Sequence, residues 1–174
     1  ARRFAQLLAP AGLILRLDGG TTSLGTMTPA GQMQGVEAAL RIGADAVAVS
    51  VFPGTPEEAL GLRALASVVN EAHRWGLPVM GEMQPGGFDA PASQRTAEAV
   101  AVAARVAAEY GADWVKVPYA EGYERVISTC FVPVVMLGGS RLDNPGALLQ
   151  SVHTGLQAGA AGVAIGRNIF QARS

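Results

Sequence analysis

Several residue types that mark common kinds of functional site are scarce in this 174-residue chain. A single cysteine, Cys130, excludes an internal disulfide, and one cysteine with two histidines gives too few ligands for a structural zinc site. The formal net charge is −1, so no basic surface for nucleic acid or for an anionic membrane is expected. No apolar run reaches the roughly 18 residues that a membrane span needs. We therefore expect a protein without nucleic-acid or membrane partners, in a reducing, cytoplasmic compartment.

Lysine is the scarcest charged side chain. The chain has 13 basic residues, and all of them are arginine except Lys116. Apolar residues flank Lys116 in the run Trp-Val-Lys-Val, which we predict to be a buried strand. A buried amine is costly unless it is neutral or paired, and a neutral amine can attack a carbonyl to form a Schiff base. The alternative is a lysine in a structural ion pair, for instance with Glu82.

Apolar residues and glycine are abundant, at 49% hydrophobic residues and 22 glycines, so a hydrophobic core can form. A motif of Gly-Ala-Asp followed by an apolar run occurs at residues 43–49 and 111–117, with a weaker Gly-Ala-Ala copy at 159–165. Each copy follows a stretch of helical period, which predicts a helix, a glycine-closed turn and a buried strand. Strands are predicted near residues 12–18, 46–52, 78–84, 113–117, 133–137 and 162–165. Helices are predicted near residues 1–9, 30–42, 56–75, 92–110, 120–129 and 144–158.

These strands are apolar almost throughout, and most are followed by a helix. That order predicts a parallel sheet covered by helices, so the fold class is α/β, either a (β/α)8 TIM barrel or a doubly wound sheet. Six strands do not close the usual eight-stranded barrel of about 250 residues. We expect a single (β/α) barrel domain over residues 1–174, truncated at both ends, with a smaller or open sheet as the alternative.

Ligands of parallel α/β folds bind beyond the carboxyl ends of the strands. The last two predicted strands end in glycine-rich turns, whose backbone amides can face an anion with no side chain in the way. The alternative is that these glycines only keep the turns tight. The candidate phosphate-binding residues are Gly138, Gly139, Ser140, Gly166 and Arg167. The candidate catalytic residues at the strand ends are Asp18, Glu82, Gln84, Lys116 and Tyr119.

Three motifs resemble the class I (Schiff-base) aldolase family of the archaeal-type fructose-bisphosphate aldolases, which also holds heptulosonate synthases and the autoinducer-2-phosphate thiolase. Residues 112–119 (Ala-Asp-Trp-Val-Lys-Val-Pro-Tyr) resemble the strand-six motif that carries the imine lysine. Residues 132–140 resemble the strand-seven phosphate loop, and residues 158–171, the most specific of the three, resemble the strand-eight motif. The resemblance implies a TIM barrel of which this chain carries strands three to eight.

The resemblance also implies a reaction. Lys116 would form the imine with a phosphorylated ketose, no metal or organic cofactor would be needed, and the protein would form a homo-oligomer. The family's aldolases and synthases carry a proton-transferring tyrosine where this chain has Gln84, and an amide cannot exchange a proton usefully. Either Glu82, Tyr119 or Asp18 takes that role, or the reaction differs.

We therefore predict a class I aldolase, a lyase that cleaves or forms a carbon–carbon bond. One alternative is a transferase of the same family, a thiolase acting with coenzyme A or a heptulosonate-type synthase. A further alternative is a phosphosugar-binding barrel without catalysis.

Overall fold

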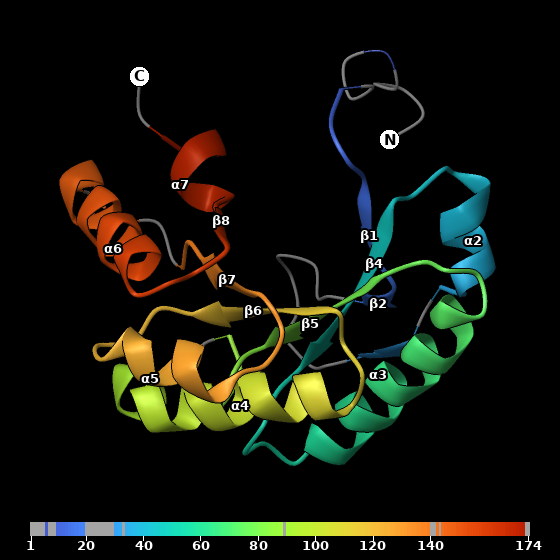
Figure 1. The fold of residues 1–174 in the computed structure, drawn as a ribbon, viewed down its shortest axis with the longest axis horizontal. Helices are drawn as coiled ribbons and strands as arrows, with labels where there is room; N and C mark the ends of the chain where they lie inside the picture. The colour runs from blue at the N-terminus through green and yellow to red at the C-terminus, as the bar shows by residue number, and fades with distance from the viewer. Residues whose placement is uncertain are drawn as a thin grey trace.

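The computed structural model describes residues 6, 10–19, 30–32, 34–88, 90–139, 142 and 144–172. Their centre is one parallel six-stranded sheet in which the strands follow one another in chain order. The strands are β1 (Ile14–Arg16), β4 (Ala46–Val51), β5 (Val79–Met83), β6 (Trp114–Pro118), β7 (Val134–Leu137) and β8 (Gly162–Ala164). The sheet is strongly curved, with β1 and β8 at its edges, and it forms half of a barrel (Figure 1). The predicted α/β fold and its six parallel strands are confirmed.

Helices cover the outer side of this half-barrel (Figure 1). They are α2 (Val36–Arg41), α3 (Glu58–His73), α4 (Ala97–Glu109), α5 (Tyr123–Thr129) and α6 (Pro145–Gln157). A short helix, α7 (Arg167–Phe170), follows β8, and a short 3-10 helix spans Ala92–Gln94. None of the helices in these described parts has the length and apolar character needed to cross a bilayer.

The helix predicted over residues 30–42 is wrong in its first half. Residues Ala30–Gln32 form a short strand, β3, that pairs antiparallel with β2 (Asp18–Gly19). Glycines at 31 and 35 weaken helix propensity, and the backbone finds hydrogen-bond partners in β2 instead. The helix predicted over residues 1–9 falls almost entirely outside the described residues.

The start of α3 also differs from the predicted helix start at residue 56. The helix begins at Glu58, two residues later, because the Thr55 hydroxyl donates to the Phe52 carbonyl at 2.8 Å and closes a turn. The Glu58 carboxylate accepts from the Gly54 amide at 2.8 Å, which fixes the turn to the first residue of the helix.

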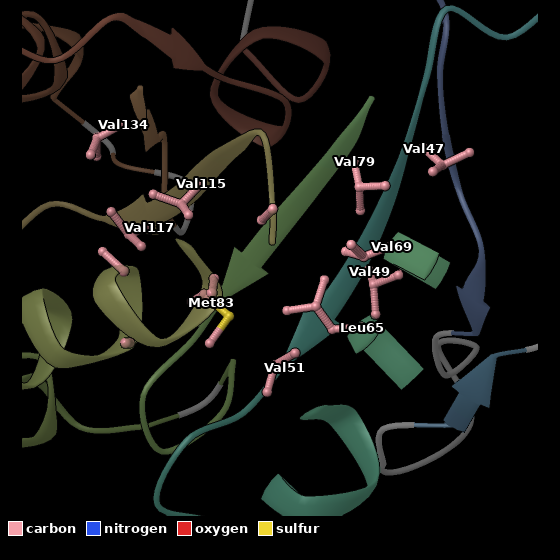
Figure 2. Close-up of a cluster of buried hydrophobic side chains, with 14 of the residues drawn as sticks. Val47, Val49, Val51, Leu65, Val69, Val79, Met83, Val115, Val117 and Val134 are labelled. Atoms are coloured by element: carbon pink, nitrogen blue, oxygen red, sulfur yellow. The ribbon is translucent and has the colours of Figure 1, made fainter. Parts of the chain in front are cut away.

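The hydrophobic core lies between the sheet and the outer helices. Alternate strand residues point outward into it, as the two-residue period of a strand requires. Figure 2 shows Val47, Val49 and Val51 of β4 beside Leu65 and Val69 of α3. The intervening residues are therefore left to face the inner side of the sheet.

The repeated Gly-Ala-Asp motif has a structural explanation. The Asp45 carboxylate accepts the backbone amide of Leu13 at 2.7 Å, and the Asp113 carboxylate accepts that of Val79, also at 2.7 Å. In each case an aspartate just before one strand holds the amide at the start of the neighbouring strand. The third copy has Ala161 at this position and so has no carboxylate for this role.

Candidate active site

The inner face of the sheet carries one row of register partners. Ser50 on β4 is opposite Glu82 on β5, Glu82 is opposite Lys116 on β6, and Lys116 is opposite Val135 on β7. Neighbouring residues in such a row lie close enough for their side chains to interact. The register of the sheet therefore brings a hydroxyl, a carboxylate and the only lysine of the chain together.

The side chains in this row are connected. Lys116 Nζ lies 2.9 Å from Glu82 Oε1, and the two side chains are 21% and 10% exposed. The Ser50 hydroxyl donates to the other carboxylate oxygen, Glu82 Oε2, at 3.2 Å. The ion pair that the sequence left open as an alternative is thus present, and it lies on the inner face of the sheet.

Asp18 is held by a different partner. The Arg16 guanidinium donates to both carboxylate oxygens of Asp18, from Nε at 3.1 Å and from Nη2 at 2.8 Å, and the Ser50 backbone amide donates to Oδ1 at 3.2 Å. Burial alone would lower the pKa of Arg16, but its hydrogen bonds to Asp18 and the charges of Asp18 and Glu82 raise it overall. Asp18 is therefore engaged in a two-point ion pair beside the Lys116–Glu82 pair.

A cavity of about 620 Å³ opens at the carboxyl ends of the strands. It is lined by Arg16, Glu82, Gln84, Phe88, Arg95, Lys116, Leu137, Gly138, Gly139, Ala164, Gly166, Arg167 and Phe170. It therefore joins the Lys116–Glu82 pair and the buried Gln84 with both glycine-rich turns. In the described part of the chain, no three His, Cys, Asp or Glu side chains lie together as a metal site would require.

Tyr119 lies outside this set. Its side chain lines a neighbouring cavity of about 720 Å³, together with Thr96 and Glu121, and its ring is 5.6 Å from that of Tyr123 between centroids. Arg95 borders both cavities. Among the proposed catalytic residues, the structure thus groups Glu82, Gln84 and Lys116 in one cavity and Tyr119 in the next.

The turn after β7 needs its glycines for two different reasons. A Cβ on Gly138 would lie 3.0 to 3.1 Å from atoms of Ile165, and Gly139 has a φ of +67°, which L side chains rarely adopt. The Gly138 amide donates to the Ala164 carbonyl at 2.9 Å, so it is engaged in the sheet. Ser140, the third expected phosphate ligand of this turn, lies outside the described residues.

Two side chains of α7 contact the turn after β7 and hold it in place. The Asn168 side chain donates to the Gly138 carbonyl at 2.9 Å and accepts from the Leu142 amide at 2.8 Å. Arg167 donates to the Gly139 carbonyl at 3.3 Å. The two glycine-rich turns are therefore one connected unit, with Arg167 at its surface.

Three residues of this region were not singled out from the sequence: Arg16, Arg95 and Asn168. Arg16 could have been found, because it is two residues before Asp18 and strand alternation places both on one face. Asn168 follows the last glycine-rich turn and lies within the motif at residues 158–171, but nothing in that motif marks it individually. Arg95 falls within the helix predicted near residues 92–110, but in the structure it lies in the connection between β5 and α4, because α4 begins only at Ala97.

Comparison with known proteins identifies relatives over almost the whole chain. A family model described as DeoC/LacD family aldolase matches residues 2–172. The chain is 36% identical over 161 residues to 2-amino-3,7-dideoxy-D-threo-hept-6-ulosonate synthase 1 of Archaeoglobus fulgidus, covering 92% of this chain and 60% of that protein. It is 37% identical over 165 residues to 2-amino-4,5-dihydroxy-6-oxo-7-(phosphonooxy)heptanoate synthase of Streptomyces griseus, covering 92% and 59%. The chain spans about 60% of the length of these curated relatives.

Solved structures with the same fold are also found. A Schiff-base-forming fructose-1,6-bisphosphate aldolase matches with a TM-score of 0.84 and 34% identity, over 94% of this chain and 66% of that one. An archaeal fructose-1,6-bisphosphate aldolase, with its catalytic lysine covalently bound to the carbinolamine intermediate, matches with a TM-score of 0.85 and 31% identity, over 99% and 70%.

Proposed function

This chain belongs to the DeoC/LacD aldolase family, and on that premise we propose that it is a class I aldolase. Lys116 forms a Schiff base with the ketone of a phosphorylated ketose, and the adjacent carbon–carbon bond is cleaved or formed. The observation that carries the proposal is the 2.9 Å contact between Lys116 Nζ and Glu82 Oε1, inside the cavity that both glycine-rich turns reach.

The reaction begins with a proton transfer from the Lys116 ammonium to Glu82. The free amine adds to the ketone carbon, Glu82 returns the proton to the carbinolamine hydroxyl, and water leaves to give the protonated imine. As the adjacent carbon–carbon bond breaks, its electron pair moves to the imine nitrogen. The Glu82 carboxylate, which has given its proton to the leaving water, accepts the proton of the hydroxyl on the departing carbon. That half of the substrate leaves as an aldehyde. Protonation of the enamine and hydrolysis then release the second product and restore Lys116.

Glu82 is the acid/base residue in this proposal. It contacts the amine directly, and the Ser50 hydroxyl orients its second oxygen. The other candidates are less suited: Gln84 has no exchangeable proton of useful acidity, Asp18 is engaged by Arg16 on both oxygens, and Tyr119 lines the neighbouring cavity. General acid–base catalysis requires a group within hydrogen-bond reach of the proton it moves, which Glu82 satisfies.

The substrate phosphate binds at the glycine-rich turns in this proposal, on the amides of Gly139 and Gly166 and on Arg167. The Gly138 amide donates to the Ala164 carbonyl, so Gly138 shapes the turn instead of holding the phosphate. Ser140 remains a proposed ligand. Binding the phosphate at a distance from the reacting carbon holds the carbonyl against Lys116, which lowers the entropic cost of the attack.

The proposal is tested by trapping the imine. The protein is incubated with dihydroxyacetone phosphate, reduced with borohydride and digested with trypsin, which cuts after Arg105, Lys116 and Arg125. A reduced adduct blocks the cut at Lys116, so an intact 106–125 peptide of increased mass is expected. The control is the Lys116→Met variant, which yields no adduct. If no phosphorylated ketone leaves a stable adduct on Lys116, the proposal is wrong.

A synthase reaction is the second candidate, favoured by the names of the two curated relatives. In that reaction a co-substrate is consumed: either the enamine carbon formed on Lys116 adds to the carbonyl of a second aldehyde, or an acyl group is transferred to the thiol of coenzyme A. Efficient cleavage of fructose 1,6-bisphosphate, measured by a coupled assay of the triose products, would exclude it. Phosphosugar binding with the same slow turnover in the wild type and in Lys116→Met would instead indicate a non-catalytic barrel.

We also propose that the reaction needs no metal or organic cofactor and that the protein acts as a homo-oligomer. Both proposals come from the resemblance of the chain to the class I aldolase group. Activity that survives prolonged dialysis against EDTA supports the first, and sedimentation equilibrium of the purified protein tests the second.

A further inference from the structure

A single buried serine connects two ion pairs on the inner face of the sheet. Arg16 is paired with Asp18, and Lys116 is paired with Glu82. The backbone amide of Ser50, which is 2% exposed, donates to Asp18 Oδ1 at 3.2 Å. Its hydroxyl donates to Glu82 Oε2, also at 3.2 Å. The two cations and two carboxylates therefore form one connected group around Ser50.

The Arg16 side chain lies near Glu82 as well as Asp18. Arg16, Glu82 and Lys116 together line the 620 Å³ cavity at the strand ends, and the same three residues line a second cavity of about 600 Å³. Burial lowers the pKa of Arg16, whereas the hydrogen bonds and charge of Asp18, and then the charge of Glu82, raise it overall. Glu82 therefore has two cations in its surroundings, and it forms an ion pair with Lys116.

Asp18 occupies the Arg16 guanidinium at two points, Nε at 3.1 Å and Nη2 at 2.8 Å. Without this carboxylate, Arg16 would need another counter-charge. Among the described residues that line the two cavities, Glu82 is the one carboxylate. A guanidinium can hold a carboxylate at two points, whereas an ammonium acts as a point charge. An unoccupied Arg16 would therefore compete with Lys116 for Glu82.

We propose that Asp18 is a positioning residue that keeps Arg16 away from Glu82 and so leaves Glu82 at the Lys116 amine. This inference rests on the proposed function, in which Glu82 and Lys116 exchange a proton. If Arg16 captured Glu82, the Lys116 amine would lose its proton acceptor. Asp18 then affects the reaction through Arg16 and Glu82, without contact to the reacting atoms.

The test measures the rate at which borohydride traps the imine of dihydroxyacetone phosphate on Lys116. In Asp18→Asn the maximal rate is expected to fall by about 10- to 100-fold, because Glu82 is drawn away from the amine. The half-saturating ketone concentration is expected to stay unchanged, since the phosphate binds elsewhere. Adding Arg16→Met to Asp18→Asn removes the competing cation. This double variant is expected to return to within about threefold of the wild-type rate.

A general weakening of the fold predicts a different pattern. In the Glu82→Gln background no carboxylate is left for Arg16 to capture, so Asp18→Asn is expected to lower the trapping rate no further. Damage to the fold would lower the rate in either background, and removal of Arg16 would not repair it. Asp45→Asn is the matched control, because Asp45 also accepts a backbone amide of the neighbouring strand. It is expected to lower stability and to leave the trapping rate unchanged.

A spectroscopic measurement separates this inference from the proposed function. Lys116 is the only lysine, so protein labelled with 13C at lysine Cε gives a single lysine signal. In Asp18→Asn this signal is expected to move towards its position in Glu82→Gln, and to return in the double variant with Arg16→Met. A wild type that forms no imine refutes the aldolase, whereas the lysine signal still decides this inference. The inference is wrong if Asp18→Asn leaves the signal at its wild-type position, or if the double variant resembles Asp18→Asn.

Discussion

Glu82 and Lys116 are register partners on neighbouring parallel strands, and the strand register alone brings their charged ends to 2.9 Å. Both side chains lie on the inner face because β5 and β6 each alternate between core and cavity residues. Such a pair is specified by the same hydrogen-bond ladder that specifies the sheet. A register shift of one residue would move Glu82 to the core side and separate the pair.

Glu82→Gln tests the proton-transfer role. Glutamine keeps the size of the side chain and can accept the Ser50 hydrogen bond, but it cannot take a proton from Lys116. We expect turnover to fall by about 10²- to 10⁴-fold, the usual contribution of a positioned acid/base group. Steady-state kinetics measures the fall, and binding of inorganic phosphate serves as the control and is expected to stay unchanged. Near-normal turnover would assign the proton transfer to another group.

Asp18→Asn tests how much the ion pair between Asp18 and Arg16 stabilises the fold. The substitution removes the charge of a carboxylate that holds Arg16 at two points and accepts the Ser50 amide, while it leaves the size of the side chain unchanged. Because Arg16 is 36% exposed, solvent screens part of the loss, and we expect the free energy of unfolding to fall by about 1–2 kcal/mol. Urea titration measures it. Glu37→Gln removes an exposed ion pair with Arg41 and is expected to change stability far less.

Asn168→Ala tests the connection between the two glycine-rich turns. The change removes the donor to the Gly138 carbonyl and the acceptor of the Leu142 amide. We expect a several-fold rise in the KM of the phosphorylated ketone, because the turn that carries Gly139 is no longer held in place. Isothermal titration with inorganic phosphate measures the same loss without turnover. Unchanged phosphate affinity would show that the turn keeps its shape without Asn168.

The strands and most helices were predictable because their signals are local. Apolar runs, the Gly-Ala-Asp motif and the alanine-rich helical stretches each specify a strand, a turn or a helix within a few residues. The pairing of β2 with β3 was not predictable, because each strand has only two or three residues and the pairing depends on tertiary contact. The helix predicted over residues 30–42 failed for the same reason.

The candidate site could be proposed from the sequence where composition made a residue unusual. Lys116 is notable as the only lysine, and the glycine turns are notable for their spacing. Arg95 is one of twelve arginines, and nothing in its sequence neighbourhood distinguishes it from a surface arginine. Its position at the cavity depends on how the connection after β5 folds back against Phe88, which no local pattern encodes.

Tyr123 provides a prediction about stability and pH. Its side chain is buried, its hydroxyl has no hydrogen-bond partner in the described structure, and burial, followed by the charge of Cys130, raises its pKa above the ordinary value of about 10. The folded protein therefore keeps this proton at a pH where the unfolded chain has already lost it. Stability from this group is complete below pH 10 and falls as pH rises above it.

Tyr123→Phe removes both effects at once. The phenyl ring keeps the packing against Tyr119, while the buried hydroxyl, which is costly without a partner, disappears. We expect the free energy of unfolding at pH 7 to rise by up to about 1–2 kcal/mol, and its decline above pH 10 to become shallower. Urea titrations at pH 7, 9, 10 and 10.5 measure both quantities, with the exposed Tyr110→Phe as control. A loss of stability at pH 7 would mean that the hydroxyl has a partner in solution. An unchanged decline above pH 10 would mean that the titration of Tyr123 does not contribute to it.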